Sequence, residues 1–254
     1  MEGPLGHRNR RVVEAARLHK SRERRRLGRT LLEGPNLLAD ALANGVVPEV
    51  VLAAADDEVT AGLAERHGFE LVTVDEPALA RLAGTRTPRG PAAVISIPAI
   101  ATSPGAHLLV SWGVSDPGNV GTLIRTAAAF GWDFGHTPGS ADPWSPKALR
   151  AGAGGHFRIG IRPVETVLEL LTAGFVAVAS VVSGGIAPSS LPSGRYALLV
   201  GEESSGLPAE VVGSAPVKVT IPMPGGIESL NAAMAAGIIV HQLSKPEGEH
   251  GGRV

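Results

Sequence analysis

Short apolar runs rich in valine, leucine and isoleucine alternate with helical patterns along most of this chain of 254 residues. Turn-forming residues separate each run from the amphipathic stretch that follows it. Strands that alternate with helices are typical of α/β domains, in which helices connect neighbouring strands. The sequence therefore predicts an α/β fold.

An uncharged stretch with two prolines and a glycine, PAIATSPG at 98–105, divides this alternation into two series. Before it we expect strands at 30–32, 49–54, 69–74 and 92–97, and helices at 8–27, 34–44, 57–67 and 77–82. After it we expect strands at 107–112, 177–182, 196–200 and 217–221, and helices at 119–130, 165–171 and 229–243. We therefore predict domains at 1–97 and 107–245, a linker at 98–106 and a flexible tail at 246–254.

Composition excludes several classes of protein. Hydrophobic residues make up 44% of the chain, which is enough for a packed core. The absence of cysteine excludes disulfide frameworks, thiolate zinc sites and cysteine nucleophiles. No apolar run approaches the ~18 residues of a membrane span. The arginine-rich start lacks the apolar segment of a secretory signal, so we expect a cytoplasmic protein with no membrane partner.

The charge of the chain is unevenly distributed. Residues 1–30 contain ten basic and three acidic residues, a net of +7, whereas the rest of the chain has a net of −8. Such asymmetry is typical of a basic arm that binds a polyanion, although a solvated helix is the alternative. Aromatic residues make up 4% of the chain, which favours recognition of nucleic-acid backbone and shape over base stacking. The candidate RNA-binding residues are Arg22, Arg24, Arg25, Arg26, Arg29, Arg89 and Arg150.

Three segments of the second series combine a strand end or polar loop with the start of a helix. They are DPGNVGTLIRTA at 116–127, LVGEESSGLP at 199–208 and IPMPGGIESLNAAM at 221–234. In open α/β sheets, ligands bind at the ends of strands in such loops. Each segment alone also fits an ordinary capped helix or turn. The chain has no dinucleotide fingerprint and no Walker P-loop.

Two lesser candidates carry less weight. The glycine-rich segment AGAGG at 151–155 lacks the lysine and hydroxyl of a phosphate-binding loop, so we expect a flexible loop there. His136 and His156 have no companions at the spacing of metal ligands, so we expect no metal.

Taken together and in order, the three segments resemble the motifs of the SpoU family. These are TrmH-like RNA ribose 2′-O-methyltransferases of the SPOUT superfamily, which use S-adenosylmethionine. The motif N-x-G-x-x-x-R-x-A matches Asn119, Gly121, Arg125 and Ala127. The motif G-N-E-x-x-G-L matches Gly201, Glu203, Gly206 and Leu207. The motif I-P-M followed by S-L-N matches Ile221–Met223 and Ser229–Asn231.

The chain departs from the family pattern at two positions. Glu202 occupies the place of the usual asparagine, which adds negative charge near the cofactor. Gly152 occupies a place where relatives often carry serine. The first hundred residues resemble the family's L30e-like substrate-binding domain, through a basic opening helix, LLEGPNLLADAL at 31–42 and TRTPRGPAAV at 85–94.

The resemblance implies a C-terminal methyltransferase domain with a trefoil-knotted parallel sheet and a smaller N-terminal L30e-like α/β domain. It implies that Asn119, Arg125, Glu203, Ser229 and Asn231 act in catalysis. It implies cofactor contacts from Ser180, Val181, Gly201, Glu202, Ile221, Pro222, Met223, Ser229, Leu230 and Asn231. It also implies a homodimer formed through the helix at 229–243.

We therefore expect methyl transfer from S-adenosylmethionine to a ribose 2′-hydroxyl of structured RNA. Among structured RNAs, we favour ribosomal (23S) RNA as the substrate. Arg125 acts either as a base assisted by an RNA phosphate or by electrostatic positioning, since a guanidinium rarely gives up its proton. The alternatives are a transfer-RNA methyltransferase and a non-catalytic RNA-binding protein that uses the fold as a dimer scaffold. A dehydrogenase is disfavoured because the glycine fingerprint is missing.

Overall fold

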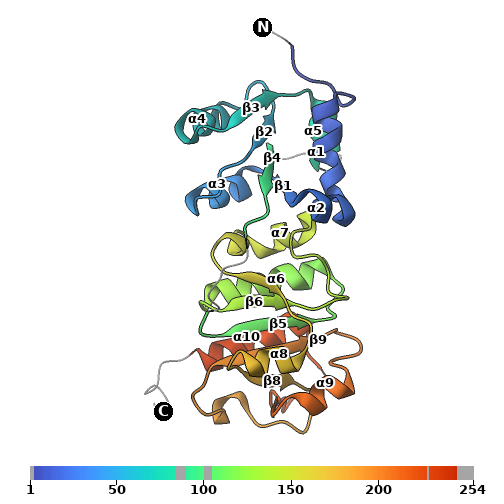
Figure 1. Cartoon of the computed structure of the whole chain (residues 1–254), viewed down its shortest axis with the longest axis vertical. Helices are drawn as coiled ribbons and strands as arrows, with labels where there is room; N and C mark the ends of the chain where they lie inside the picture. The colour runs from blue at the N-terminus through green and yellow to red at the C-terminus, as the bar shows by residue number, and fades with distance from the viewer. Residues whose placement is uncertain (1–2, 84–89, 100–104, 228, 245–254) are drawn as a thin grey trace. The chain divides into compact units, whose positions relative to one another are not determined.

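The computed structural model describes residues 3–83, 90–99, 105–227 and 229–244, and the chain forms two compact units (Figure 1). Unit 1 contains residues up to Ala99 together with Asp142–Arg158. Unit 2 contains Ile100–Ala141 and the residues from Ile159 onward. The first division falls in the expected linker at 98–106. The domains at 1–97 and 107–245 stay a prediction, and the segment 142–158, which lies within the second of them, packs within unit 1.

Unit 1 is built on a four-stranded sheet in the order β1-β4-β2-β3. The strands are β1 (Arg29–Glu33), β2 (Val50–Ala53), β3 (Glu70–Thr73) and β4 (Ala92–Ser96). The helices are α1 (Arg10–Ala16), α2 (Ser21–Leu27), α3 (Pro35–Ala43), α4 (Glu58–His67), α5 (Glu76–Ala83) and α7 (Pro146–Gly152). Strand β4 runs antiparallel to β1 and β2, and β2 and β3 are parallel.

Two apolar layers enclose this sheet. Successive strand residues point to opposite faces, so Leu31 packs with residues of α1 and α5 while Leu32 packs with residues of α3 and α7. Figure 1 shows α1 and α5 on one side of these strands and α3 on the other. The predicted strands of this half are confirmed to within two residues at each end.

The helix predicted at 8–27 is interrupted. Asn9 caps α1, and a 3-10 turn at Arg17–His19 follows. Lys20 is extended before α2 begins, and Gly28 ends α2 with a φ of 62°. On the separate helix α2, Arg24 is the buried residue.

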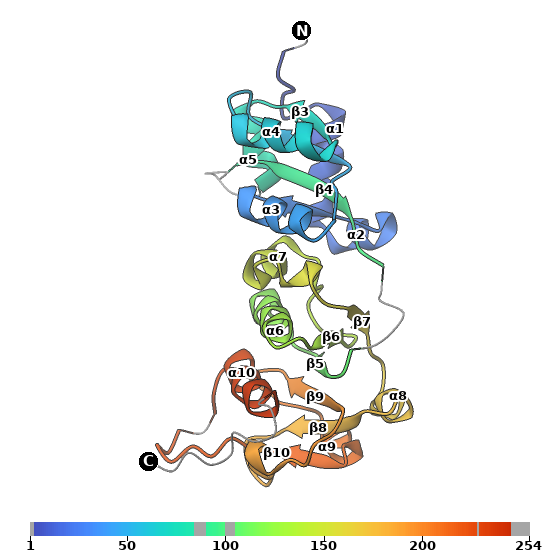
Figure 2. The ribbon, with the colours of Figure 1, turned by 90° about the vertical axis from the view of Figure 1, so that its left-hand side faces the viewer.

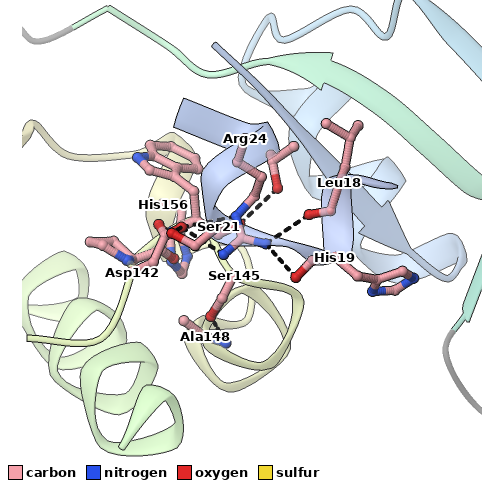
Figure 3. Close-up of polar contacts among 11 residues, drawn as sticks. Leu18, His19, Ser21, Arg24, Asp142, Ser145, Ala148 and His156 are labelled. Carbon is pink, nitrogen blue, oxygen red and sulfur yellow. Dashed lines mark hydrogen bonds and ion pairs between the residues drawn. The ribbon is translucent and has the colours of Figure 1, made fainter. Parts of the chain in front are cut away.

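Arg24 is a buried charge in unit 1 that connects the chain before α2 with Asp142 (Figure 3). Its side chain is 3% exposed, and Nε and Nη2 donate to one carboxylate oxygen of Asp142 at 2.9 and 2.6 Å. Its Nη1 donates to the carbonyls of Leu18 at 2.7 Å and His19 at 2.9 Å. A buried charge is tolerated when it is paired and hydrogen-bonded, and this guanidinium is both.

The segment 142–158 completes the core of unit 1. Leu149 on α7 is fully buried in the cluster that contains Leu32. Gly154 has a φ of 77°, and a Cβ at this position would lie 2.5 Å from a carboxylate oxygen of Asp40. The prediction of a flexible loop at 151–155 is wrong, because these glycines end α7 in a tightly packed turn.

Unit 2 is built on six parallel strands in the order β10-β8-β9-β5-β6-β7. The strands are β5 (Leu108–Trp112), β6 (Asp133–His136), β7 (Ile161–Pro163), β8 (Val176–Ser180), β9 (Tyr196–Gly201) and β10 (Val217–Val219). The helices are α6 (Pro117–Ala129), α8 (Val167–Thr172), α9 (Ala209–Ser214) and α10 (Ala232–Leu243). Helices α6 and α10 pack side by side on one face, and α8 and α9 cover the other (Figure 2). Every residue of β9 is buried, as expected for a strand covered on both faces.

The loop after β8 lies against β10. The N–H of Ile186 donates to the carbonyl of Lys218 at 3.0 Å, and the N–H of Thr220 donates to the carbonyl of Ile186 at 2.9 Å. A Cβ at Gly185 would lie 2.7 Å from the carbonyl carbon of Val219, so glycine permits this approach. The trefoil knot implied by the family resemblance stays a prediction.

We predict that Asp142→Ala lowers the free energy of unfolding by about 3–5 kcal/mol, because it leaves the Arg24 guanidinium buried without a carboxylate. The free energy of unfolding of unit 1 is measured by hydrogen exchange of the backbone amides of β1 at increasing urea concentrations. The matched control is Glu23→Ala, which removes the surface partner of Arg26 and changes stability by about 1 kcal/mol or less. Equal effects of the two variants would contradict the assignment.

Candidate active site

A cavity of about 370 Å³ lies at the carboxyl ends of the strands of unit 2. The parallel registers place Val219 beside Ser180 and Trp112 beside Gly201, so β8, β9, β10 and β5 end close together. The lining residues are Ser180, Val181, Val182, Val200, Gly201, Glu202, Glu203, Ser204, Ser205, Gly206, Ile221, Met223, Ser229, Leu230, Ala232 and Ala235. This size, with apolar and hydroxyl groups together, is typical of a small-molecule site.

The end of β9 turns back tightly on itself. A Cβ at Gly201 would lie 2.2 Å from the carbonyl carbon of Gly206 and 2.4 Å from the nitrogen of Leu207. Gly206 has a φ of 68°, and its N–H donates to the carbonyl of Glu202 at 2.8 Å. Both glycines of the predicted motif are therefore required by the backbone, and the turn leaves Glu202 and Glu203 at the rim of the cavity.

Side chains from all three motifs meet at this rim. Glu203 Oε2 accepts hydrogen bonds from Nδ2 of Asn119 and from Nδ2 of Asn231, both at 3.2 Å. Nδ2 of Asn231 also lies 3.2 Å from Oδ1 of Asn119. We call these three residues the rim cluster.

Helix starts fix the two asparagines of the rim cluster. Asp116 caps α6, and its carboxylate accepts from the N–H of Asn119 at 2.9 Å. Asn231 caps α10, with Oδ1 accepting from Ala233 and Met234. Helix α10 therefore begins at Ala232, three residues later than predicted, because the Ser229–Asn231 motif forms the loop and cap.

Glu202 is turned toward the loop that follows β5. Its Oε2 accepts from the N–H of Ser115 at 2.6 Å, and its Oε1 accepts from the N–H of Glu203 at 3.1 Å. The bond from the Ser115 backbone is the largest of the effects that lower the pKa of the Glu202 carboxyl. These hydrogen bonds therefore favour the ionised form of the Glu202 carboxyl.

Arg125 lies on α6, six residues after Asn119, which is about 9 Å along a helix axis. Its side chain is exposed. It makes no hydrogen bond or ion pair with any residue that the structure describes, so the structure does not join it to the rim cluster. The guanidinium is available to a bound molecule.

Eight of the ten expected cofactor residues line the cavity, and Pro222 and Asn231 do not. Sequence reasoning missed Val200, Ser204, Ser205, Gly206, Ala232 and Ala235 as lining residues. The two serines could have been found, because they stand between the matched Glu203 and Gly206 of the second motif. The alanines could not, because their role depends on how closely α10 approaches the strand ends.

The arginines expected to bind RNA differ in their availability. Arg24 is buried and bonded to Asp142, so its assignment to RNA binding does not fit the structure. The remaining exposed members with partners are Arg26, paired with Glu23; Arg29, paired with Glu49; and Arg150, paired with Glu33. Arg22 and Arg25 are exposed and have no hydrogen bond or ion pair within the described part of the chain. Arg89 lies outside the described residues.

The described residues contain no cluster of three or more His, Asp or Glu side chains arranged to hold a metal ion. Among the helices described, none is long and apolar enough to cross a membrane.

Known proteins match both halves of the chain. Residues 106–241 match the SpoU rRNA Methylase family, and residues 9–93 match the MRM3-like substrate binding domain. The chain is 33% identical over 243 residues to the 23S rRNA (guanosine(2553)-2'-O)-methyltransferase RlmP of Bacillus subtilis, covering 92% of this chain and 96% of that protein.

Solved structures agree with this match. The AdoMet-bound rRNA methyltransferase from Sinorhizobium meliloti is 26% identical with a TM-score of 0.80, over 92% of this chain and 94% of that one. The SpoU methyltransferase AviRb from Streptomyces viridochromogenes, 24% identical with a TM-score of 0.84 over 93% and 97% of the two chains, shares the fold. The resemblance inferred from the three motifs is confirmed.

Proposed function

The chain belongs to the SpoU rRNA methylase family, and on that premise we propose that it methylates a ribose 2′-hydroxyl of ribosomal RNA in the cytoplasm with S-adenosylmethionine. The observation that carries the proposal is the rim cluster of Asn119, Glu203 and Asn231 beside the cavity. Ribosomal RNA is favoured over transfer RNA because the Bacillus subtilis relative is named for 23S rRNA.

The cavity fits S-adenosylmethionine in its chemistry. Val181, Met223 and Leu230 offer apolar surface to an adenine ring, and Ser180 and Ser229 offer hydroxyls. The missing side chain at Gly201 lets a ligand approach backbone closely. When bound, S-adenosylmethionine supplies a methyl carbon whose bond to the positively charged sulfur breaks as the bond to the ribose oxygen forms.

The side chains of the site prepare the ribose for this attack. A ribose hydroxyl is a poor nucleophile until its proton is drawn away, so orientation and charge stabilisation are both needed. Glu203 and the two asparagines supply fixed acceptors and donors that orient the ribose. The proton of the 2′-hydroxyl passes to an RNA phosphate or to water, and Arg125 supplies a positive charge to that phosphate or to the 2′-oxygen.

We expect the protein to bind S-adenosylmethionine in a calorimetric titration and to transfer a labelled methyl group to ribosomal RNA. Arg125→Ala should lower kcat about 10²–10³-fold, as loss of one charge-stabilising donor does, while RNA affinity changes little. Arg66→Ala, at an exposed arginine of α4, is the control.

Several results would contradict the proposal. A non-catalytic scaffold would bind no S-adenosylmethionine at millimolar concentration. Equal losses of RNA affinity and of kcat in Arg125→Ala would make Arg125 an RNA anchor only. Mapping of 2′-O-methyl sites on RNA from cells with and without the protein identifies the nucleotide and separates ribosomal from transfer RNA.

We propose that the outward face of α2 binds RNA phosphates. Arg22 and Arg25 lie three residues apart, on the side of the helix away from buried Arg24. Each phosphate contact that is lost should reduce the slope of log affinity against log salt by about 1.

The double variant Arg22→Ala, Arg25→Ala should therefore weaken RNA binding and flatten its salt dependence by about 2 units of slope, measured by fluorescence anisotropy. Arg10→Ala, at an arginine paired with Glu14, is the matched control; a slope in the double variant equal to that of the control would exclude this face.

We also propose a homodimer formed through α10 and the end of α6. Met234 and Ile238 lie four residues apart on α10 and are 59% and 38% exposed, and Phe130 after α6 is 38% exposed. Such adjacent apolar side chains on packed helices suit an interface with a second copy.

Met234→Glu with Ile238→Glu should give a monomer in sedimentation equilibrium, whereas Leu168→Glu, at a 70% exposed leucine of α8, should leave the dimer intact. A dimer in both variants would place the interface elsewhere.

A further inference from the structure

Two consecutive carboxylates at the end of β9 hold two different parts of the start of α6. Glu203 accepts from the side chain of Asn119, on the first turns of the helix. Glu202 accepts from the backbone N–H of Ser115, the residue just before the helix cap Asp116. The loop after β9 therefore grips α6 at two points.

Both oxygens of the Glu202 carboxylate are used within the loops. Oε2 lies 2.6 Å from the Ser115 nitrogen, and Oε1 lies 3.1 Å from the Glu203 nitrogen. The carbonyl of Glu202 accepts from Gly206 at 2.8 Å, which fixes the main chain as well. This geometry leaves the carboxylate facing the protein's own backbone although it borders the cavity.

Glu202 holds Ser115 in the segment 113–115, which leads directly into α6, the helix that carries Asn119 and Arg125. Gly113 N–H donates to Thr137 Oγ1 at 3.0 Å, and the carbonyl of Val114 accepts from Ala141 at 2.8 Å. These bonds fix the segment to the loop after β6. The bond from Ser115 adds a connection to the loop after β9, which carries Glu203.

We propose that Glu202 is a positioning residue, which sets the distance between Asn119 and Glu203 by holding Ser115. The inference rests on the proposed function of this site. A hydrogen bond to a charged acceptor is about twice as strong as one between neutral groups. A carboxylate at position 202, where the family motif has asparagine, therefore makes a stronger connection than a neutral amide.

The test uses Glu202→Ala, Glu202→Gln and the control Glu210→Ala, which removes an exposed glutamate of α9. Hydrogen exchange of the Ser115 amide, read by NMR on the full-length protein, reports the bond itself. Steady-state kinetics give kcat and KM, and calorimetry gives the affinity for S-adenosylmethionine.

We expect Glu202→Ala to speed exchange of the Ser115 amide and to lower kcat, each about tenfold, the loss typical of one hydrogen bond to a charged group. The affinity for S-adenosylmethionine should stay within about twofold, because the carboxylate faces the backbone. Glu202→Gln keeps an acceptor oxygen and should recover part of both losses. Glu210→Ala should match the wild type.

Two outcomes would overturn the proposal: an unchanged Ser115 exchange rate in Glu202→Ala, or weakened S-adenosylmethionine binding with kcat intact, which would make Glu202 a cofactor contact. If Glu202→Ala does not fold, Glu202→Gln carries the same comparison. Failure of the proposed function is recognised separately, because the wild type itself would then transfer no methyl group, while Ser115 exchange would still report the bond.

Discussion

The parallel alignment of all six strands in unit 2 is the constraint on which the rest of the site depends. Parallel strands end at one edge of the sheet, so segments far apart in the sequence are delivered to the same place. Asn119 and Glu203 are 84 residues apart, and Asn119 and Asn231 are 112 apart, yet they form one hydrogen-bonded cluster. The helices on both faces make this alignment possible, because they bury a sheet whose central strand β9 has no exposed residue.

The site owes its shape to backbone as much as to side chains. Gly201 brings β9 within contact of the returning chain at Gly206, so the loop has no room for an ordinary residue at its base. The turn places two adjacent carboxylates beside each other, and backbone N–H groups satisfy one of them. Side-chain amides of Asn119 and Asn231 satisfy the other, so hydrogen bonds within the site reach both carboxylates.

The sequence predicted the elements that repeat a clear pattern, and it failed where the structure depends on distant partners. Strands such as β5 and β9 are continuous apolar runs and were found, whereas β6 (DFGH) and the three-residue β7 carry too few apolar residues to be recognised. The motifs identified Asn119, Glu203 and Asn231, but the contact between Glu202 and Ser115 spans 87 residues and leaves no local signal. The sequence prediction assigned Arg24 to RNA binding together with its neighbours because no nearby residue indicates its partner. The carboxylate that binds Arg24 belongs to Asp142, 118 residues later in the sequence.

The buried pair of Arg24 and Asp142 has a consequence for the order in which the chain is made. A ribosome adds about 5–20 residues per second, so Asp142 follows Arg24 by roughly 6–24 s of synthesis. N-terminal domains generally fold first during synthesis. When β4 has been synthesised, however, unit 1 still lacks Leu149 of its core and Asp142, the partner of Arg24. Strands β5 and β6 of the other unit must be synthesised before that partner emerges. We therefore expect the two units to mature in an interleaved order, with unit 1 completed only after synthesis of unit 2 has begun.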